Sequence, residues 1–225
     1  MKFRIGVDEA GRGSLVGELV VAAFAMRVEE EKALIEMGVK DSKKLSPGRR
    51  AELYKLLRTR PFAVYAIHPR DIDSSNLNKL ELKAIFNVLK ALSLRLGDEF
   101  KQSRIVVDKF ADISLELRVL LRSLGFNGIV LVEENADDKY VEVSAASIIA
   151  KYLRDRRIEV LRSLYGVEGS GYPSDQRTLN WLDKVLKSGT RPPIIRYSWA
   201  TLDRFGLRVE KKAKVTYKTL DEYIR

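Results

Sequence analysis

Acidic side chains stand where three predicted β-strands end, and they are the residues of this sequence best suited to chemistry. These residues are Asp8, Glu9, Asp108, Asp137 and Asp138. In α/β proteins, ligands collect at the carboxyl ends of parallel strands, so neighbouring parallel strands would bring Asp8, Asp108 and Asp137 to one edge of the sheet. Glu9 would point to the opposite face of its strand or turn in with the following loop.

Converging carboxylates repel one another, and without compensation one of them would take up a proton. A pair of Mg²⁺ or Mn²⁺ ions removes this problem, because hard cations prefer oxygen ligands. Two such ions about 4 Å apart can stabilise both the attacking and the leaving oxygen of a phosphodiester. Any one of these residues alone is more simply a helix cap or a solvated loop residue, but three in this order favour a metal site.

A glycine-rich segment, with Gly11, Arg12 and Gly13, follows the first acidic pair. Glycines let a backbone approach a ligand closely, and N–H groups there can meet phosphate or sugar oxygens. Together with Gly17 the pattern is close to a dinucleotide-binding fingerprint, but residues 19–28 read as a strand where that fingerprint requires a helix. A tight turn between two strands is an equally good interpretation.

The composition of the 225-residue chain excludes several classes of site. It has 41 Lys and Arg against 31 Asp and Glu, for a formal net charge of +10, with one His and no Cys. Disulfides, thiolate nucleophiles and Cys-based metal centres are therefore excluded, and the single His68 excludes a two-His zinc cluster. The positive charge favours a polyanionic partner, although a charged surface can equally serve solubility or heat adaptation. With no apolar run of the roughly 18 to 20 residues that span a bilayer and no signal peptide, we expect a cytoplasmic protein without a membrane partner.

The remaining sequence must position these residues. Apolar runs predict strands over residues 2–8, 19–28, 62–67, 104–108 and 129–132. Helical spacing, caps and glycine stops predict helices from Ser46-Pro47 and over residues 76–96, 112–124, 141–165 and 174–187. Three strands followed by alternating helices and strands predict an α/β fold with parallel strands covered by helices. The Gly- and Pro-containing stretch 166–173 is the clearest boundary, so we predict a catalytic domain over 1–170 and a small C-terminal helical extension and tail over 171–225.

Several motifs match one known family in chain order. They are GVDEAGRG (6–13), DSKKLS (41–46), VD (107–108), ADDKY (136–140) with SAASIIAK (144–151), GSGYPSD (169–175) and RYSWATL (196–202). Together they resemble ribonuclease HII, the type 2 ribonucleases H, and the last motif resembles the archaeal branch. The resemblance runs from about residue 3 to about residue 205.

The resemblance implies an RNase H-like fold, with a mixed five-stranded sheet flanked by helices, and a metal-dependent endonuclease. Such enzymes hydrolyse the RNA strand of RNA–DNA hybrids. They also cut 5′ of ribonucleotides embedded in duplex DNA, leaving 3′-hydroxyl and 5′-phosphate ends, in primer removal and ribonucleotide repair. By motif position, the catalytic ligands of Mg²⁺ or Mn²⁺ are Asp8, Glu9, Asp108 and Asp137. The substrate-binding positions are Gly11, Arg12, Gly13, Lys43, Lys44, Ser144 and Tyr172.

Within that set, the resemblance makes the Gly-Arg-Gly segment the reader of the ribose 2′-hydroxyl and makes Tyr172 the residue that packs on the sugar at an RNA–DNA junction. The family pattern places the fourth ligand two residues before Lys139, which selects Asp137 over Asp138. The chain departs from the pattern at Ser14, Glu18 and Asn135, which affects substrate preference more than the carboxylates. We expect a monomer.

Two other functions stay open on the residues alone. The net charge also suits a non-catalytic basic module that binds nucleic acid. A Mg²⁺-dependent phosphatase of small molecules is the third possibility, although the first strand is not followed by a D-x-D pair. Near the end of the chain, Lys211, Lys212 and Lys214 are predicted to add affinity for nucleic acid and no chemistry.

Overall fold

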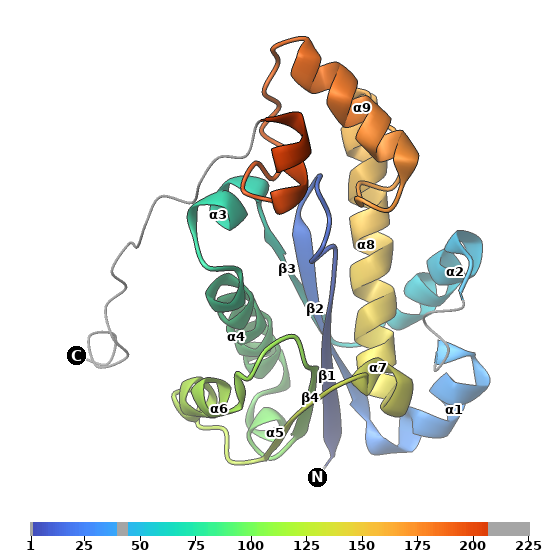
Figure 1. Cartoon of the computed structure of the whole chain (residues 1–225). Helices are drawn as coiled ribbons and strands as arrows, with labels where there is room; N and C mark the ends of the chain where they lie inside the picture. Colours follow the sequence, from blue (N-terminus) through green and yellow to red (C-terminus); the bar gives the residue numbers. More distant parts are fainter. Residues whose placement is uncertain (1, 40–44, 207–225) are drawn as a thin grey trace.

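The computed structural model describes residues 2–39 and 45–206, which form a five-stranded sheet with helices on both faces (Figure 1). The strands are β1 (Phe3–Ala10), β2 (Leu19–Arg27), β3 (Phe62–Ile67), β4 (Arg104–Asp108) and β5 (Ile129–Glu133). Their order in the sheet is β3-β2-β1-β4-β5. β1, β4 and β5 run parallel, whereas β2 pairs antiparallel with β1 and β3. The predicted mixed five-stranded sheet is confirmed.

Helices connect and cover these strands. They are α1 (Glu31–Glu36), α2 (Pro47–Leu57), α3 (Pro69–Ser74), α4 (Leu77–Leu96), α5 (Asp98–Lys101), α6 (Ser114–Arg122), α7 (Ala136–Lys139), α8 (Val141–Tyr165) and α9 (Gln176–Lys187), with 3₁₀ helices η1 (Val28–Glu30) and η3 (Ala200–Phe205). The predicted Ser46 cap is present, because its hydroxyl accepts a hydrogen bond from the third backbone N–H of α2. The Asn76 side chain caps α4 in the same way. Gly97 ends α4 with φ of 59°. None of the described helices is both long and apolar enough to cross a bilayer.

The sheet separates two apolar layers, one under α4 and one under α8 (Figure 1). Ile5 and Val7 of β1 belong to the layer with α4, whereas Ala22 and Phe24 of β2 belong to the layer with α8. Gly6 marks the place where α8 crosses β1, because a Cβ there would overlap the α8 backbone. A glycine is therefore needed for the helix to lie this close to the strand.

A third apolar cluster joins the C-terminal part of the described chain to the rest of the fold. Leu15 and Val16, from the loop between β1 and β2, pack in it with Ile158 of α8 and Trp181 of α9. Backbone hydrogen bonds run from Leu15 N to the Gly171 carbonyl and from Gly17 N to the Ile194 carbonyl, both at 2.8 Å. The cluster holds residues from both sides of position 170, and the division of the chain there stays a prediction.

Several element boundaries differ from the predictions by one or two residues, among them the ends of β1, β2, β5 and α6 and the start of α9. β1 extends to Ala10, so Asp8 and Glu9 lie inside the strand and do not follow it as expected. The reason is that β2 continues to pair with β1 as far as Ala10 opposite Val20, which polar side chains do not prevent. The helix predicted over 112–124 is the shorter α6. Lys43, Lys44 and the three tail lysines lie outside the described residues.

Candidate active site

β1 presents its two acidic side chains on opposite faces of the sheet. Asp8 shares the α8 face with Gly6, and it is 6% exposed. Glu9 shares the α4 face with Val7 and is half-buried. One carboxylate oxygen of Asp8 accepts a hydrogen bond from the Glu9 backbone N–H at 2.8 Å. A single strand end thus supplies a carboxylate to each side of the sheet, as the alternation of a strand requires.

Burial of Asp8 against α8 raises the pKa of its carboxyl to about 6. The nearby Asp108 carboxylate adds to the rise, and the Ser147 hydroxyl and the Lys151 ammonium oppose it. Ser147 and Lys151 lie four residues apart on α8, so they share the helix face that crosses β1. The motif analysis did not single out these two residues, although their spacing along the predicted helix indicated a common face.

Glu9 lies on the other face of the sheet, but its carboxyl interacts electrostatically with the same acidic side chains. Burial raises the pKa of its carboxyl, and the charges of Asp8, Glu81 and Asp108 raise it further, whereas Arg12 lowers it. The carboxylates therefore interact across the strand end, and each makes ionisation of the others more costly.

The carboxyl ends of β4 and β5 bring the other two candidates to this edge. Asp108 ends β4, and one of its oxygens accepts a hydrogen bond of 2.6 Å from the backbone N–H of Ala136, the first residue of α7. The next residue, Asp137, is 4% exposed, while Asp138 is exposed. Asn135 turns the chain into α7 with a left-handed φ of 54°. The residue that the family pattern selects is thus the buried one of the two.

The candidate carboxylates suit a divalent cation because all of them offer oxygen ligands. Within residues 2–39 and 45–206, no three acidic or histidine side chains form a ready-made chelating group. What the structure shows is an all-oxygen set in which burial and mutual repulsion raise the pKa values of Asp8 and Glu9. A hard divalent cation among these oxygens would offset the repulsion, and Mg²⁺ and Mn²⁺ are the cations that prefer such ligands.

The glycine loop follows directly after Ala10. Gly11 has φ of 91°, and its carbonyl accepts a hydrogen bond of 3.2 Å from Ser14 N, which closes a turn. A Cβ on Gly11 would lie 3.0 Å from the Glu18 carbonyl oxygen, whereas Gly13 is exposed and has open space around it. The loop therefore offers its backbone at Gly13 to a ligand.

The Arg12 side chain binds α4. Its Nε donates to the Glu81 carboxylate at 2.9 Å and its Nη2 donates to the Asn78 side-chain oxygen at 2.6 Å. Burial raises the pKa of the fully buried Glu81 to about 7, and Arg12 opposes that rise. Sequence reasoning missed Glu81, although a Glu on the apolar stripe that continues through Ala84 and Val88 was a usable signal.

Tyr172 lies beside the glycine loop, whereas Ser144 does not. The half-buried Tyr172 ring has the Arg154 guanidinium 4.4 Å from its centroid. The preceding Gly171 carbonyl accepts hydrogen bonds from Leu15 N and from the Ser14 hydroxyl. Ser144 is fully buried in α8, and its hydroxyl donates to the Val39 carbonyl. In the described structure Ser144 therefore secures the chain just before residues 40–44 and does not face solvent.

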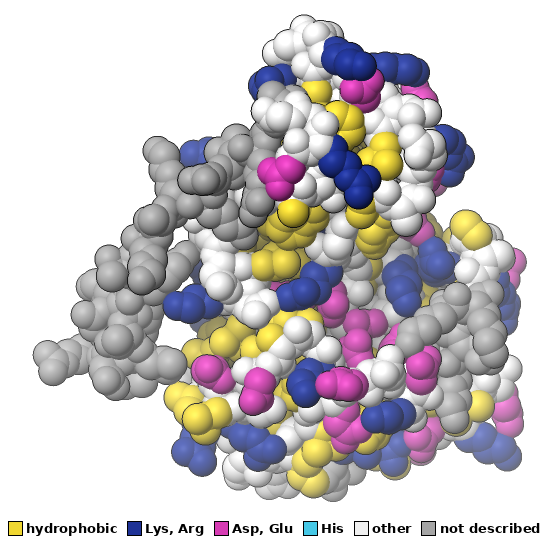
Figure 2. Space-filling model, in the orientation of Figure 1, with side chains coloured by type: hydrophobic (Ala, Val, Ile, Leu, Met, Phe, Trp, Pro, Cys, Tyr) yellow, Lys and Arg dark blue, Asp and Glu magenta, His cyan; other side chains and the backbone are white. Residues whose placement is uncertain are grey.

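Figure 2 shows acidic side chains in the hollow centre of one face of the molecule, with Lys and Arg side chains around them.

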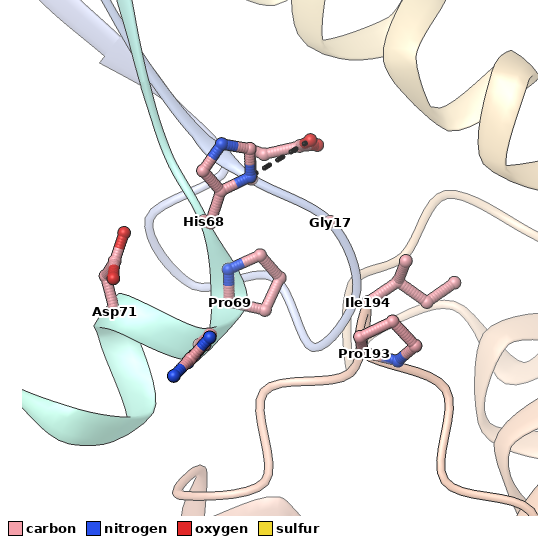
Figure 3. Close-up of a pocket in the computed structure, with 8 residues that line it drawn as sticks. Gly17, His68, Pro69, Asp71, Pro193 and Ile194 are labelled. Carbon is pink, nitrogen blue, oxygen red and sulfur yellow. Dashed lines mark ion pairs between the residues drawn. The ribbon is translucent and has the colours of Figure 1, made fainter.

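A separate cavity of about 430 Å³ lies near the loop between β1 and β2 (Figure 3). Its walls are Gly17, Glu18, His68, Pro69, Arg70, Asp71, Pro193 and Ile194. His68 and Arg157 both contact the same oxygen of Glu18 there, at 3.7 and 2.9 Å. The cavity contains none of the predicted site residues.

Comparisons with a family model, with known sequences and with solved structures all match this chain to ribonucleases H. Residues 5–202 match the family model described as Ribonuclease HII. Ribonuclease HII of Aeropyrum pernix is 46% identical over 226 residues, which cover 100% of this chain and 99% of that protein. The crystal structure of the ribonuclease H2 from Pyrococcus horikoshii OT3 matches with a TM-score of 0.77 and 38% identity over 90% of this chain and 96% of that one. Bst-RNase HIII, crystallised in complex with Mn²⁺, matches with a TM-score of 0.75 at 21% identity, over 90% of this chain and 68% of that one, and shares the fold.

Proposed function

Because the chain belongs to the ribonuclease HII family, we propose that it is a metal-dependent endoribonuclease acting on RNA–DNA hybrids and on duplex DNA that contains ribonucleotides. It hydrolyses the RNA strand of a hybrid and cuts 5′ of an embedded ribonucleotide, leaving 3′-hydroxyl and 5′-phosphate ends. These reactions suit primer removal and ribonucleotide repair. We propose that the enzyme is a monomer.

The observation that carries this proposal is the buried carboxylate group at the strand ends. Asp8, Glu9, Asp108 and Asp137 would hold two Mg²⁺ or Mn²⁺ ions, because burial and the nearby Asp108 charge disfavour the ionised form of Asp8 and cations would offset both effects. When bound, such ions make a water nucleophilic and stabilise the charge that develops on a phosphodiester. Lys151 lies close enough to Asp8 to lower its pKa, so it helps to keep that ligand ionised.

Recognition of RNA falls to the segments beside the carboxylates. The 2′-hydroxyl is the group that distinguishes a ribonucleotide from a deoxyribonucleotide, so a reader must contact the sugar closely. The open backbone at Gly13 permits that approach, and the contacts of Arg12 with α4 hold the loop in place. Tyr172, joined to the same loop through Gly171, would pack on the sugar at the junction. The net charge of +10 supports attraction to the phosphate backbone.

A cleavage assay on duplex DNA with one ribonucleotide tests the proposal. We expect a cut 5′ of the ribonucleotide that requires Mg²⁺ or Mn²⁺, with the product ends mapped by gel and by end-specific labelling. Asp108→Asn should abolish cleavage and leave binding to the hybrid intact, because it removes one ligand charge and preserves the size of the side chain. Asp98→Asn is the matched control, since that side chain is 93% exposed and pairs only with Lys101 in the described structure. An Asp108→Asn variant with normal activity would contradict the metal site, and wild-type binding without any product would support the non-catalytic module.

A further inference from the structure

Arg154 is a buried cation whose partners are mostly not acidic. Its side chain comes from α8 and is 5% exposed. The acidic neighbour, Asp155, is half-buried and lies 3.7 Å from Nη1. Burying a guanidinium is costly unless polar groups satisfy it, so the contacts of Arg154 indicate what the residue is there to hold.

Those contacts reach two segments that are far apart in the sequence. Arg154 Nη2 donates to the Ser14 hydroxyl at 3.0 Å, on the glycine loop, and to the Ser170 carbonyl at 2.6 Å, in the segment that carries Tyr172. The guanidinium also lies 4.4 Å from the centroid of the Tyr172 ring. One side chain therefore touches both segments that we assign to recognition of the ribonucleotide.

Gly171 makes room for this side chain, because a Cβ there would lie 2.8 Å from Nη2. A Cβ on Gly11 would lie 3.5 Å from Nε, which is ordinary van der Waals contact. Both glycines have positive φ, 91° and 84°. The Gly171 backbone thus approaches Arg154 more closely than a larger residue would allow. The glycine loop and the Tyr172 segment also contact each other, through the hydrogen bond between Leu15 N and the Gly171 carbonyl.

We propose that Arg154 is a positioning residue that sets the spacing between the glycine loop and the Tyr172 ring, and so determines the preference for a ribonucleotide at a junction. The inference rests on the proposed function. Arg154 does not itself meet the substrate, because it is buried beneath both segments. It acts through the loop backbone and through Tyr172. α8 gives it a rigid base, since the same helix places Ser147 and Lys151 beside Asp8.

The planar guanidinium is essential to this role. Nη2 alone donates to both acceptors, while the guanidinium carbon lies 4.4 Å from the centroid of the Tyr172 ring. A compact lysine ammonium at the position of Nη2 could reach the two acceptors, but it would not also cover the ring. Arg154→Lys should therefore lower kcat/KM almost as much as Arg154→Met does. Wild-type kinetics in the lysine variant would overturn the proposal.

A double-mutant cycle with Tyr172→Ala measures the coupling. On duplex DNA with a single ribonucleotide, we expect Arg154→Met to lower kcat/KM about tenfold, mainly through KM, which corresponds to the strength of a desolvated contact between a guanidinium and an aromatic ring. On a hybrid with a long RNA strand the loss should be smaller, because many ribonucleotides can occupy the site. In the Tyr172→Ala background, Arg154→Met should cost much less than it costs in the wild type, because the part of its effect that passes through the ring is already lost. Losses that multiply would overturn the coupling of Arg154 to the ring.

Hydrogen exchange provides a readout that does not depend on activity. In Arg154→Met, the amides of residues 11–17 and 169–173 should both exchange faster, because both segments lose their shared anchor. Arg156→Met is the matched control, since Arg156 lies on the same helix, is 62% exposed and pairs with Glu159. Unchanged exchange in either segment of Arg154→Met would overturn the proposal. If the wild-type protein cleaves neither substrate, the proposed function fails, while the exchange experiment still decides whether Arg154 positions the two segments.

Discussion

Two neighbouring regions of this molecule bury charge in opposite ways. At the strand ends, burial raises the pKa of Asp8 to about 6, and the adjacent Asp108 adds to the rise. In the loop region, burial lowers the pKa of the fully buried Arg196 to about 10, yet at neutral pH that group stays charged. The same physical cause, loss of hydration, thus leaves one group close to protonation and the other far from losing its proton.

The contacts of the two regions explain the difference. Arg196 donates from Nε to the Gly17 carbonyl and from Nη1 to the Arg12 carbonyl, both at 3.0 Å. Its charge is therefore stabilised by the loop that it holds. The Asp8 carboxyl instead has the Asp108 carboxylate near it, which raises its pKa, and the Lys151 ammonium, which lowers it. Arg196 thus serves the loop as a structural support, whereas the carboxylate region is where we propose that a divalent cation binds.

The sharpest test of the carboxylate region compares two adjacent residues. Asp137→Asn should lower kcat by at least about a hundredfold, because it removes a charge from the site where the reaction needs electrostatic stabilisation. Asp138→Asn should stay close to wild type, since that side chain is exposed while Asp137 is 4% exposed. Single-turnover cleavage at saturating Mg²⁺ measures both. Equal losses in the two variants, or the larger loss in Asp138→Asn, would remove Asp137 from the site.

Much of the fold could be predicted from the sequence because apolar periodicity is strong. The bounds of β3, β4 and α8 match the predicted ranges, Ser46 caps α2 as expected, and Gly97 ends α4 as expected. The end of β1 was wrong by two residues. Local polarity suggested an end where pairing with β2 continues, and pairing is a property of the tertiary structure.

Site residues could be predicted from the sequence only where they lie at the ends of strands. Strand order brought the three aspartates to one edge, but nothing local separates the buried Arg154 from the exposed Arg156 two residues later. The partners that bury Arg154 lie 140 and 16 residues away. Glu81 is similar, because its partner Arg12 is 69 residues away. Charges that depend on distant partners become visible only in the folded structure.

The arginine region should respond in stability. Arg196→Met removes a guanidinium from the loop and leaves the Arg12 and Gly17 carbonyls without their donors. A hydrogen bond from a charged group contributes about 1.5 to 3 kcal/mol, so we expect a loss of about 3 kcal/mol and a fall in Tm of about 6 to 12 °C. Arg191→Met, at an exposed position nearby, is the control. A Tm within about 2 °C of wild type, on the same scale, would show that Arg196 does not support the loop.

The smallest expected effect is the pH dependence of stability in the metal-free protein. The folded pKa of Asp8 is about 6, above its usual 3.8, so the folded state holds this proton more tightly than the unfolded state. The associated stability is fully present below pH 4, decreases as the pH rises through 6 and then levels off, for a loss on the order of 2 to 3 kcal/mol. Chemical unfolding between pH 4 and 7.5, with and without Mg²⁺, measures this loss of stability.

The cation should reduce the loss of stability, because it favours ionised Asp8. Asp108→Asn should reduce it without any cation, because Asp108 raises the Asp8 pKa. If Asp108→Asn and the wild type lose the same stability, then Asp108 does not raise the pKa of Asp8. Burial alone would then explain why the carboxylate region differs from the arginine region.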